Sequence, residues 1–549
     1  MPFRRPMRLW RSLTADLLRL GVLSSVVLVG VISFAFAVRF LAEGRVDPAG
    51  ALRLMALAAV PMLQYALPFA CGLAATLTYH RVASDNEASA AMAGGISHRS
   101  LLAPAGMCAV VLAVALAFMA HEVIPRFLLT IERVVTRDLT GLLVRSIDRG
   151  ESFRLGNVEL HARQVVPAGS DPQVGAFDRL RLRGVLAVTL DERGRARGYI
   201  SADDVFVWMF EERAGNETFT SAQLYFRGAS GEGVGDAIRS GRLASQRIRI
   251  PSRFSDDPKF LSFEELRALR ERPENIGRVE ALRSRLARAL DQREVVSRLR
   301  GELTGRGSAV FVRPGGEAVT VRGAEVASEG TRLMILPRAG EPVRVDRRTA
   351  SGTTLRLLAG RAWLEPDEPG GPGEAADPRR ATFALHIEGA SVEEEGGAGS
   401  AGISDATVLG GLTLAGEGAG YAEQSSAELL ALARGESEEG IVAAARALRA
   451  RIEDLQREVT SKQHERAAYA VACALTLLCG AVTALRRDAS MPLPVYLWSF
   501  LPALGSVITI SAGQGLTHKA GAGGLALLWG GVAALGAYVL VEYSRLRRH

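Results

Sequence analysis

Three long apolar stretches near the N-terminus and three near the C-terminus constrain this chain most, because each can cross a membrane as a helix. They run from Leu20 to Val38, Leu54 to Thr78, Leu101 to Ala120, Ala467 to Leu485, Leu493 to Ala512 and Ala522 to Val541. About 20 helical residues span a hydrocarbon core of about 30 Å. Such a helix satisfies its own backbone hydrogen bonds, which lipid cannot do. The sequence therefore predicts a membrane protein with three helices at each end and one large external domain.

Basic residues in the short connections predict the orientation, because Lys and Arg resist transfer across the membrane. Twelve arginines lie in the two tails and in two of the loops: Arg4, Arg5, Arg8, Arg11, Arg19, Arg81, Arg99, Arg486, Arg487, Arg545, Arg547 and Arg548. The opposite short loops contain only Arg39, Arg45, Arg53 and Lys519. Both termini are thus expected in the cytoplasm, with the external domain on the other side of the membrane.

A cleaved signal peptide is the alternative interpretation of the first stretch, since Ala35-Phe36-Ala37 resembles a small-residue cleavage site. However, the stretch is longer than the roughly 7–15 apolar residues of a signal peptide. Its removal would also leave an odd number of spans. We therefore expect it to remain as the first transmembrane helix.

Charge and cysteine content argue against a nucleic-acid-binding protein and against an external domain stabilised by disulfides. The net charge is +7, but much of the excess lies in the tails and loops that set orientation, which argues against nucleic-acid binding. The four cysteines, Cys71, Cys108, Cys473 and Cys479, all fall in the predicted spans. No disulfide framework is therefore expected in the external domain.

Short β-type segments with turns between them characterise the external domain, expected over residues 126–460. Val185 to Leu190 and Tyr199 to Phe210 flank the polar turn Asp191 to Gly194, which indicates a hairpin. Similar segments recur as far as Thr382 to Ile387. This pattern favours a sandwich, a jelly roll or an open barrel.

Helical and loop signals interrupt the β segments. Ser262 and Glu265 form a capping-box pattern at the start of a helical insertion expected over about 262–302. Segments 365–380 and 393–402 are rich in Gly, Pro and Glu and are expected to be flexible loops. Apolar residues from Ala445 to Val459 repeat at helical spacing, and this helix is expected to continue through Lys462 to Arg466 into the fourth span.

Catalytic and metal-binding signatures are missing from the sequence. No glycine precedes a lysine, so there is no phosphate-binding G-x-x-x-x-G-K-[ST] loop. No G-x-S-x-G element occurs, and the eight histidines are scattered without metal-ligand spacing. The sequence predicts a non-enzymatic protein with no metal and no cofactor of its own.

The cytoplasmic loop between the second and third spans, over about 79–100, has the composition of a short helix. Asp85, Asn86 and Glu87 place acidic or capping groups at its start, Ala88 to Ala93 favour helix, and Gly94-Gly95 stop it. An exposed helix of this kind suits docking into a groove on another protein. A solvated connector is the alternative interpretation.

Through the residues of this loop, the sequence resembles the LptF/LptG family, which comprises the permease subunits of the lipopolysaccharide-export ABC transporter. The segment from Arg81 to Ser97 carries the most specific part of the resemblance. Further matching features are Val60-Pro61, Leu67-Pro68, Pro104, Val123-Ile124-Pro125 and His464-Glu465-Arg466. The family's external part is a single β-jelly roll, so the domain here is expected to be a jelly roll enlarged by an extra β and helical region.

The resemblance implies a set of partners and roles. It implies pairing with a second LptF/LptG-type permease, an LptB-like cytoplasmic ATPase that uses the ATP, an LptC/LptA-like periplasmic jelly-roll protein, and lipopolysaccharide as the substrate in a bacterial inner membrane. Arg81, Asp85, Glu87, Gly95 and Ser97 would form the ATPase-coupling loop, with Glu87 docking on the ATPase. Arg39 and Arg45 would meet lipid phosphates, although Arg39 also suits an interfacial anchor.

Two other functions remain open on the residues alone. A membrane-anchored structural or sensory protein that binds an envelope partner would have the same topology, but it would give the loop between spans two and three no role. A permease for another lipid-linked amphiphile differs from a lipopolysaccharide permease only through the family resemblance. The expected domains are 1–125 and 461–549 in the membrane, with 126–460 between them.

Overall fold

The chain divides into two compact units, and each is described by itself. The first unit comprises residues 1–139, 253–272 and 453–549, and the second comprises 140–252 and 273–452. The structure is a computed structural model, and the ranges that it describes are 7–42, 48–136, 152–155, 158–169, 176, 178–190, 196–214, 217–232, 237–244, 248–249, 257–313, 316–329, 332–337, 342–348, 354–367, 380–394, 401–416, 420–487 and 491–548.

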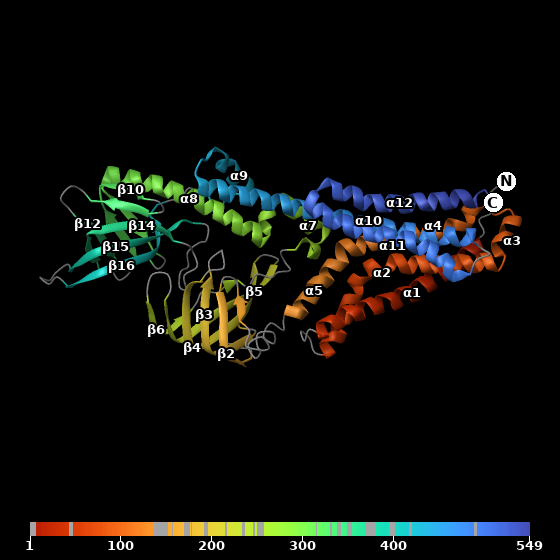
Figure 1. Cartoon of the computed structure of the whole chain (residues 1–549), viewed down its shortest axis with the longest axis horizontal. Coiled ribbons are helices and arrows are strands. Elements are labelled where there is room, and N and C mark those ends of the chain that lie inside the picture. The colour runs from red at the N-terminus through yellow and green to blue at the C-terminus, as the bar shows by residue number, and fades with distance from the viewer. Residues whose placement is uncertain are drawn as a thin grey trace. The chain divides into compact units, whose positions relative to one another are not determined.

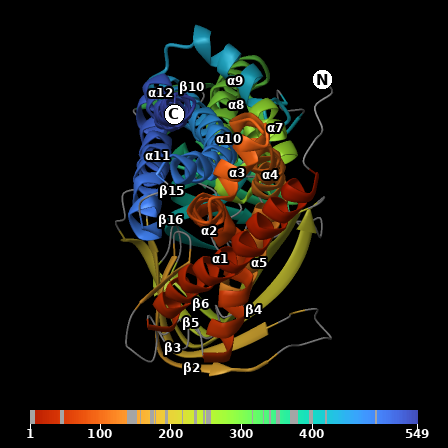
Figure 2. The ribbon, with the colours of Figure 1, turned by 90° about the vertical axis from the view of Figure 1, so that its right-hand side faces the viewer.

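In the part of the chain that the structure describes, six helices are long and apolar enough to cross a membrane, as the sequence predicts. They are α1 (Met7–Ala42), α2 (Pro48–Ser84), α4 (His98–Phe118), α10 (Glu439–Arg486), α11 (Pro492–Ala520) and α12 (Ala522–Leu546). Within the first unit these helices run lengthwise beside one another (Figure 1) and form a bundle when seen from the end (Figure 2). The expected continuation of the helix before the fourth span is confirmed, because α10 is one helix of 48 residues.

Small residues let α2 and α10 approach closely, as in many membrane bundles where helices have no hydrophobic drive to associate. A Cβ built on Gly480 of α10 would lie 2.5 Å from the carbonyl oxygen of Gly72 in α2. The hydroxyl of Thr76 donates to that same carbonyl at 2.8 Å. The two helices therefore touch through backbone at this point.

The third span continues as helix beyond Ala120, where the sequence predicts its end. The helix widens into a π-helical turn, η1 (Met119–Val123), and then continues as α5 (Ile124–Thr136). Pro125 lacks a backbone N–H and its ring would clash with the carbonyl four residues earlier, at His121, in a regular helix. The wider π turn relieves that clash, so the expectation of short segments directly after Pro125 is wrong for residues 126–136.

After the first β region the chain returns to the first unit, to which residues 253–272 belong. This stretch is called the returning segment. It contains the 3₁₀ turn η2 (Pro258–Phe260) and the helix α7 (Phe263–Glu271), whose capping box between Ser262 and Glu265 is present as predicted. The ring of Phe263 meets His121 edge to face with 5.3 Å between centroids. The guanidinium of Arg270 donates to the hydroxyl of Thr460 in α10 at 3.0 Å.

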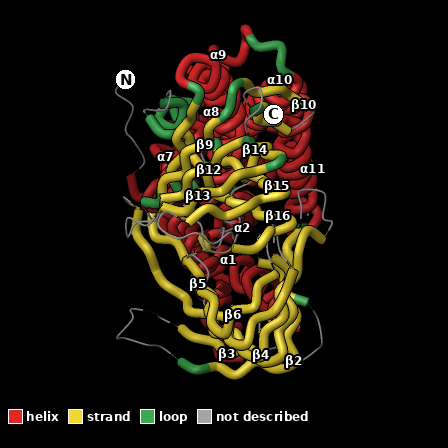
Figure 3. Tube along the Cα trace, turned by 90° about the vertical axis from the view of Figure 1, so that its left-hand side faces the viewer, coloured by secondary structure: helices red, strands yellow, loops and turns green. Residues whose placement is uncertain are grey.

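The first sheet is an antiparallel meander. Its strands are β1 (Phe153–Leu155), β2 (Val158–Pro167), β3 (Asp178–Leu190), β4 (Ala196–Ala214), β5 (Glu217–Glu232), β6 (Ala237–Ala244) and β7 (Ile248–Arg249). They pair in sequence order from β1 to β6, and β7 joins β5. The predicted hairpin is therefore confirmed as β3 and β4, while its turn at 191–195 lies outside the described residues. The longer strands bend along their length (Figure 3).

One face of the first sheet is apolar. Alternate residues such as Leu180, Leu182, Val205, Val207 and Phe226 are buried in a single cluster contributed by β2 to β5. The opposite face carries the ion pair between Arg181 and Asp204. A sequential meander does not by itself identify a jelly roll, so that part of the expected fold stays a prediction.

The second sheet contains nine antiparallel strands among the described residues. They are β8 (Ser308–Val312), β9 (Ala318–Arg322), β10 (Glu325–Glu329), β11 (Arg332–Leu336), β12 (Val343–Arg348), β13 (Thr354–Ala359), β14 (Arg361–Asp367), β15 (Thr382–Glu394) and β16 (Ala401–Leu414). The order β15-β13-β12-β9-β8-β16 closes on itself, because β16 also pairs with β15. The remaining strands β14, β11 and β10 extend outward from the first half of β15.

The second unit also contains helices, and one of them, α8 (Gly277–Arg306), packs into the core of this second sheet. The unit also contains η3 (Pro273–Asn275), α9 (Ser426–Leu432) and η4 (Ala433–Gly435). Val295, Leu299 and Leu303 of α8 join the core of the strand ring. Arg283 of α8 is only 6% exposed and donates to the carbonyl oxygens of Ala422 and Gln424, which ties the helix to the chain before α9.

The predicted helical insertion is present, but it divides between the units, with α7 in the first and α8 in the second. The flexible loops expected at 365–380 and 393–402 are shorter than predicted. Glu365 to Asp367 belong to β14, Glu393 and Glu394 to β15, and Ala401 to Gly402 to β16. The parts at 368–379 and 395–400 lie outside the described residues.

Candidate functional site

The loop between α2 and α4 forms one short helix, α3 (Glu87–Ala93), as the sequence predicts. The chain leaves α2 through a turn at Asp85 and Asn86, where Asn86 adopts a left-handed conformation with φ 60°. Its side chain makes no capping hydrogen bond, so the expectation that Asn86 caps the helix through its side chain is wrong. Capping residues have extended backbone, and the left-handed turn turns the Asn86 side chain away from that role.

Gly94 and Gly95 end this short helix, as predicted. Gly95 has φ 86°, a conformation that other residues adopt only at a cost. The amide of Ile96 donates to the carbonyl of Ala91 at 3.0 Å, and the amide of Gly95 donates to that of Met92 at 2.9 Å. These two bonds are the Schellman pattern of a helix end. Ser97 then caps α4 by accepting from the amide of Ser100 at 3.4 Å.

One face of α3 is fixed to the bundle and the other is exposed. Ala88 is 7% exposed and belongs to a cluster with Val82 and Leu101. Asp85 and Glu87 are exposed. The start of the helix therefore presents acidic groups to the surroundings, while the small buried side chain of Ala88 keeps the helix close to α2 and α4.

Side chains on α1 and α2 hold the start of α4 next to this helix. The indole of Trp10 donates to the carbonyl of Ser100 at 2.9 Å, and the hydroxyl of Tyr79 donates to that of Leu101 at 3.1 Å. Arg81 forms an ion pair with Asp16 at 2.7 Å. The arginine side chain is 54% exposed, so this pair contributes more to position than to stability.

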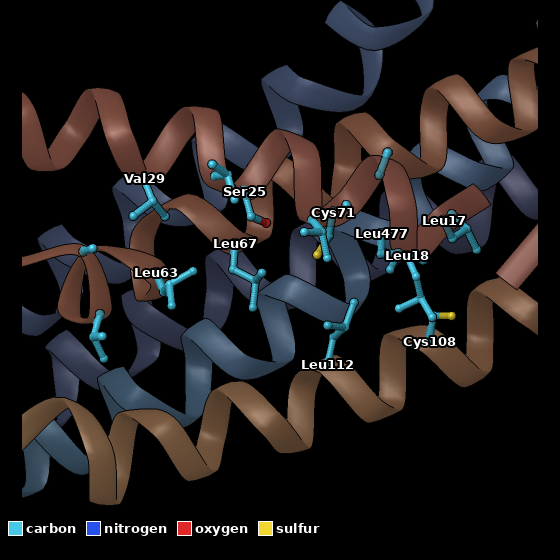
Figure 4. A pocket seen from close by; sticks show the side chains of 16 residues that line it. Leu17, Leu18, Ser25, Val29, Leu63, Leu67, Cys71, Cys108, Leu112 and Leu477 are labelled. Atoms are coloured by element: carbon cyan, nitrogen blue, oxygen red, sulfur yellow. The ribbon is translucent and has the colours of Figure 1, made fainter. Parts of the chain in front are cut away.

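An apolar pocket of about 420 Å³ opens among α1, α2 and α4, with one residue from α10 (Figure 4). Its lining is hydrocarbon apart from one hydroxyl and two thiols: Leu17, Leu18, Gly21, Val22, Ser25, Val26, Val29, Ala59, Val60, Leu63, Leu67, Cys71, Ala74, Cys108, Leu112 and Leu477. No charged side chain lines it. Chemically, the pocket can hold a hydrocarbon chain and offers almost nothing to a polar ligand.

The pocket reaches the outer surface of α1. Leu18, Val22 and Val26 line it, yet their side chains are 50%, 63% and 65% exposed. Such large apolar side chains on a membrane helix face lipid or another helix. A hydrocarbon chain could therefore pass between the bilayer and the pocket along α1 without crossing a polar barrier.

The predicted site residues fall into two separate groups. Arg81, Asp85, Glu87, Gly95 and Ser97 come together in the turns and helix between α2 and α4. Arg39 lies exposed in the last turn of α1, while Asp16, the partner of Arg81, lies near its start. These 23 residues correspond to about 35 Å along a helix, close to the thickness of a hydrocarbon core. Arg45 lies outside the described residues.

Sequence reasoning missed a buried cation where the returning segment meets the bundle. Arg466 of α10 is 4% exposed and donates to the carbonyl of Lys259 at 3.1 Å. The only sequence signal for it is the position of Arg466 just before the fourth apolar stretch. Nothing local predicts that Lys259, 207 residues earlier, supplies the acceptor.

Part of the chain matches a known protein family. The family described as "Lipopolysaccharide export system permease LptF/LptG" matches residues 13–275. The matched range contains α3 and all residues of the apolar pocket except Leu477, and it ends before α8 and the second sheet. No curated protein matches the chain.

Proposed function

Because the chain belongs to the LptF/LptG family of lipopolysaccharide export permeases, we propose that it is a permease subunit that extracts lipopolysaccharide from the bacterial inner membrane. A separate cytoplasmic ATPase drives the extraction. The lipid then passes to a periplasmic bridge of β-jelly-roll domains toward the outer membrane. The observation that carries this proposal is the family match, which includes both the acidic coupling helix α3 and nearly all of the pocket lining.

The free energy of moving an acyl chain differs between its transfer into the pocket and its transfer into water. Moving an acyl chain from the bilayer into the pocket exchanges one apolar surrounding for another, so it costs little. Moving it into water costs about 0.8 kcal/mol for each CH₂ group. The chains must therefore pass to another apolar surface, a task that this proposal gives to the periplasmic bridge of β-jelly-roll domains.

The orientation in this proposal follows from the basic residues of the short loops. It places α3 and both ends of the chain in the cytoplasm and the β sheets in the periplasm. Glu87 and Asp85 then face the ATPase, a second LptF/LptG-type permease completes the cavity, and an LptC/LptA-like protein receives the lipid. Arg39 and Arg45 lie at the periplasmic side, where guanidinium groups can pair with lipid phosphates.

Site-specific photocrosslinking tests whether lipopolysaccharide occupies the pocket. A photoreactive phenylalanine analogue replaces Leu67, which lines the pocket, or Val114, which lies on α4 outside it and is 65% exposed. Both positions are in the membrane, so bulk lipid reaches each of them. We expect an ATP-dependent lipopolysaccharide adduct at Leu67 and a weak, ATP-independent one at Val114. Equal adducts at the two positions would contradict the assignment of the pocket.

Purification from native membranes tests the assembly. A P-loop ATPase, a second six-span permease and bound lipid A should copurify with the tagged chain. Recovery of the chain alone with bulk phospholipid would favour the membrane-anchored envelope-binding protein. Recovery of the ATPase with another glycolipid would favour a permease for a different amphiphile.

A further inference from the structure

We propose that the outer face of β9, β12 and β13 in the second sheet binds the phosphorylated sugar head group of lipopolysaccharide. This inference rests on the proposed function for the identity of the ligand. The second sheet lies beyond the family match, which ends at residue 275, so family membership assigns it no role. The face, here called the arginine face, consists of the outward residues of these three strands.

The strand register sets the composition of the arginine face. Arg344 of β12 lies opposite Arg322 of β9 and Leu358 of β13. In the next outward row Asp346 lies between Thr320 and Arg356, and in the last row Arg348 lies between Ala318 and Thr354. The alternate residues point inward, since Val321, Val343 and Val345 are buried in the core of the ring.

Positive charge on this face exceeds the acid available to neutralise it. Asp346 is the shared partner of Arg322 and Arg356, at 3.2 Å from each, and its side chain is 15% exposed. Arg344 and Arg348 are exposed, and neither has an ion pair within the ranges that the structure describes. Glu393 lies opposite Arg356 in the register of β13 and β15, so the proposal rests on Arg322, Arg344 and Arg348.

The pairing of Arg344 with Arg322 is unfavourable for the sheet alone. Like charges directly opposite each other on neighbouring strands destabilise a sheet, and Cα atoms at such positions are only about 4.5–5.5 Å apart. A bound polyanion would attract both arginines, so that their position opposite each other would become favourable. Nothing in the core of the ring requires arginine at these outward positions.

The chemistry of the face fits phosphate on a sugar. Guanidinium groups bind phosphate oxygens in a bidentate manner, more strongly than neutral donors do. The hydroxyls of Thr320 and Thr354 stand in the same rows and could bond sugar hydroxyls. Because the outward residues of these rows are mostly charged or hydroxyl-bearing, the head group is the part of the lipid that this face would hold.

Binding of a deacylated head group tests this proposal apart from the proposed function. The probe is the water-soluble phosphorylated saccharide obtained by deacylating lipopolysaccharide, titrated into the full-length protein in lipid nanodiscs. It lacks the acyl chains that the membrane pocket would hold. The test variant carries Arg322→Gln, Arg344→Gln and Arg348→Gln. The matched control carries Arg306→Gln, Arg446→Gln and Arg449→Gln, three exposed arginines elsewhere in the second unit.

We expect the test variant to bind the saccharide at least about tenfold more weakly than the native protein, with a shallower dependence of affinity on salt. The control should bind like the native protein. Equal binding by the test variant would overturn the proposal. So would equal binding of the dephosphorylated saccharide, or displacement of the saccharide by an equal concentration of inorganic phosphate.

The two proposals fail in different ways. Loss of the Leu67 lipopolysaccharide adduct together with intact saccharide binding would contradict the export function while leaving an anionic-sugar site. An intact adduct with no saccharide binding would contradict only the arginine face. Circular dichroism of the purified variants should match the native spectrum, since all three substituted side chains are exposed.

Discussion

Gly480 of α10 and Gly72 of α2 meet backbone to backbone, so that a Cβ on Gly480 would lie 2.5 Å from the Gly72 carbonyl oxygen and 2.8 Å from the Thr76 hydroxyl. This contact joins the first three predicted spans to the last three. It is fixed by backbone atoms, which cannot move aside as a flexible side chain can.

Gly480→Ala should therefore destabilise the bundle by about 1–3 kcal/mol, the usual range for overpacking. The measurement is the midpoint of thermal unfolding of the purified protein in one detergent. Gly505→Ala is the control, because a Cβ on Gly505 of α11 would meet nothing within 4 Å. Equal midpoints for the two variants would show that α2 and α10 can separate at this contact without loss.

Gly95→Ala should loosen the end of α3. The left-handed conformation at Gly95 costs about 1–2 kcal/mol for a residue with a Cβ, so the Schellman bonds of Gly95 and Ile96 should weaken. Faster hydrogen exchange over residues 88–97 is the expected result. Gly94→Ala is the control, since Gly94 has an ordinary φ of −76°. Unchanged exchange in Gly95→Ala would mean that those bonds do not hold the turn.

Glu87→Lys should reduce copurification of the ATPase several-fold without reducing membrane insertion. The exposed carboxylate starts α3 and is the group that the family resemblance assigns to docking. Ser89→Lys, at an exposed position on the same helix, separates the loss of the acid from the gain of a positive charge. If both variants retain the ATPase, Glu87 has no docking role.

Neutralising Arg39 and Arg45 together with glutamine should lower lipopolysaccharide crosslinking to this chain, because phosphate contacts at the outer end of α1 would be lost. The control is Arg53→Gln with Lys519→Gln, which removes the same charge from the same predicted side. An equal decrease in both variants would indicate a general electrostatic effect. No decrease in either would favour Arg39 as an interfacial anchor.

Asp204→Asn should remove a pH-dependent contribution to the stability of the first sheet. The hydrogen bond from Arg181 lowers the pKa of Asp204 below its ordinary value, and the two bonds between these side chains measure 2.8 Å each. A lowered folded-state pKa gives stability that is present above the unfolded pKa of about 3.9 and lost as pH falls through the folded value.

The difference in unfolding midpoint between native protein and Asp204→Asn should thus be largest near neutral pH and shrink below about pH 4. Asp203→Asn, an exposed neighbour, is the control for removing one charge from this strand. A difference that stays constant across this pH range would contradict the role of the ionised carboxylate.

Features with a local signal were predictable from the sequence, and those made by distant residues were not. The six spans follow from long uncharged runs, and the α7 capping box follows from Ser262 and Glu265. The helix after Pro125 was not predicted, because one wide turn accommodates the proline ring and the chain stays helical to Thr136. Strand β16 was missed because its glycine-rich sequence gains its partners from β8 and β15, about 100 and 20 residues earlier in the chain.

The candidate functional site also has a part that could be predicted from local sequence and a part that could not. The turn after α2, the short helix and its glycine end could be predicted because their residues are consecutive. The apolar pocket could not, because residues from α1, α2, α4 and α10 form it and each looks like ordinary membrane-facing hydrocarbon. The bond from Arg466 to Lys259 depends on the return of the chain to the bundle, which no local pattern encodes.

The closed ring of the second sheet limits how this protein can be extended by strand addition. In the described part of that sheet, β10 has one unpaired side with glutamates at both of its ends, and β16 is joined to β8 only through Thr413 and Leu414. An array of β domains that grows by adding strand to strand needs a free edge at each step. Along most of the ring each strand already has a partner on both sides, so within the described residues strand addition there is confined to β10 and to the part of β16 before Thr413.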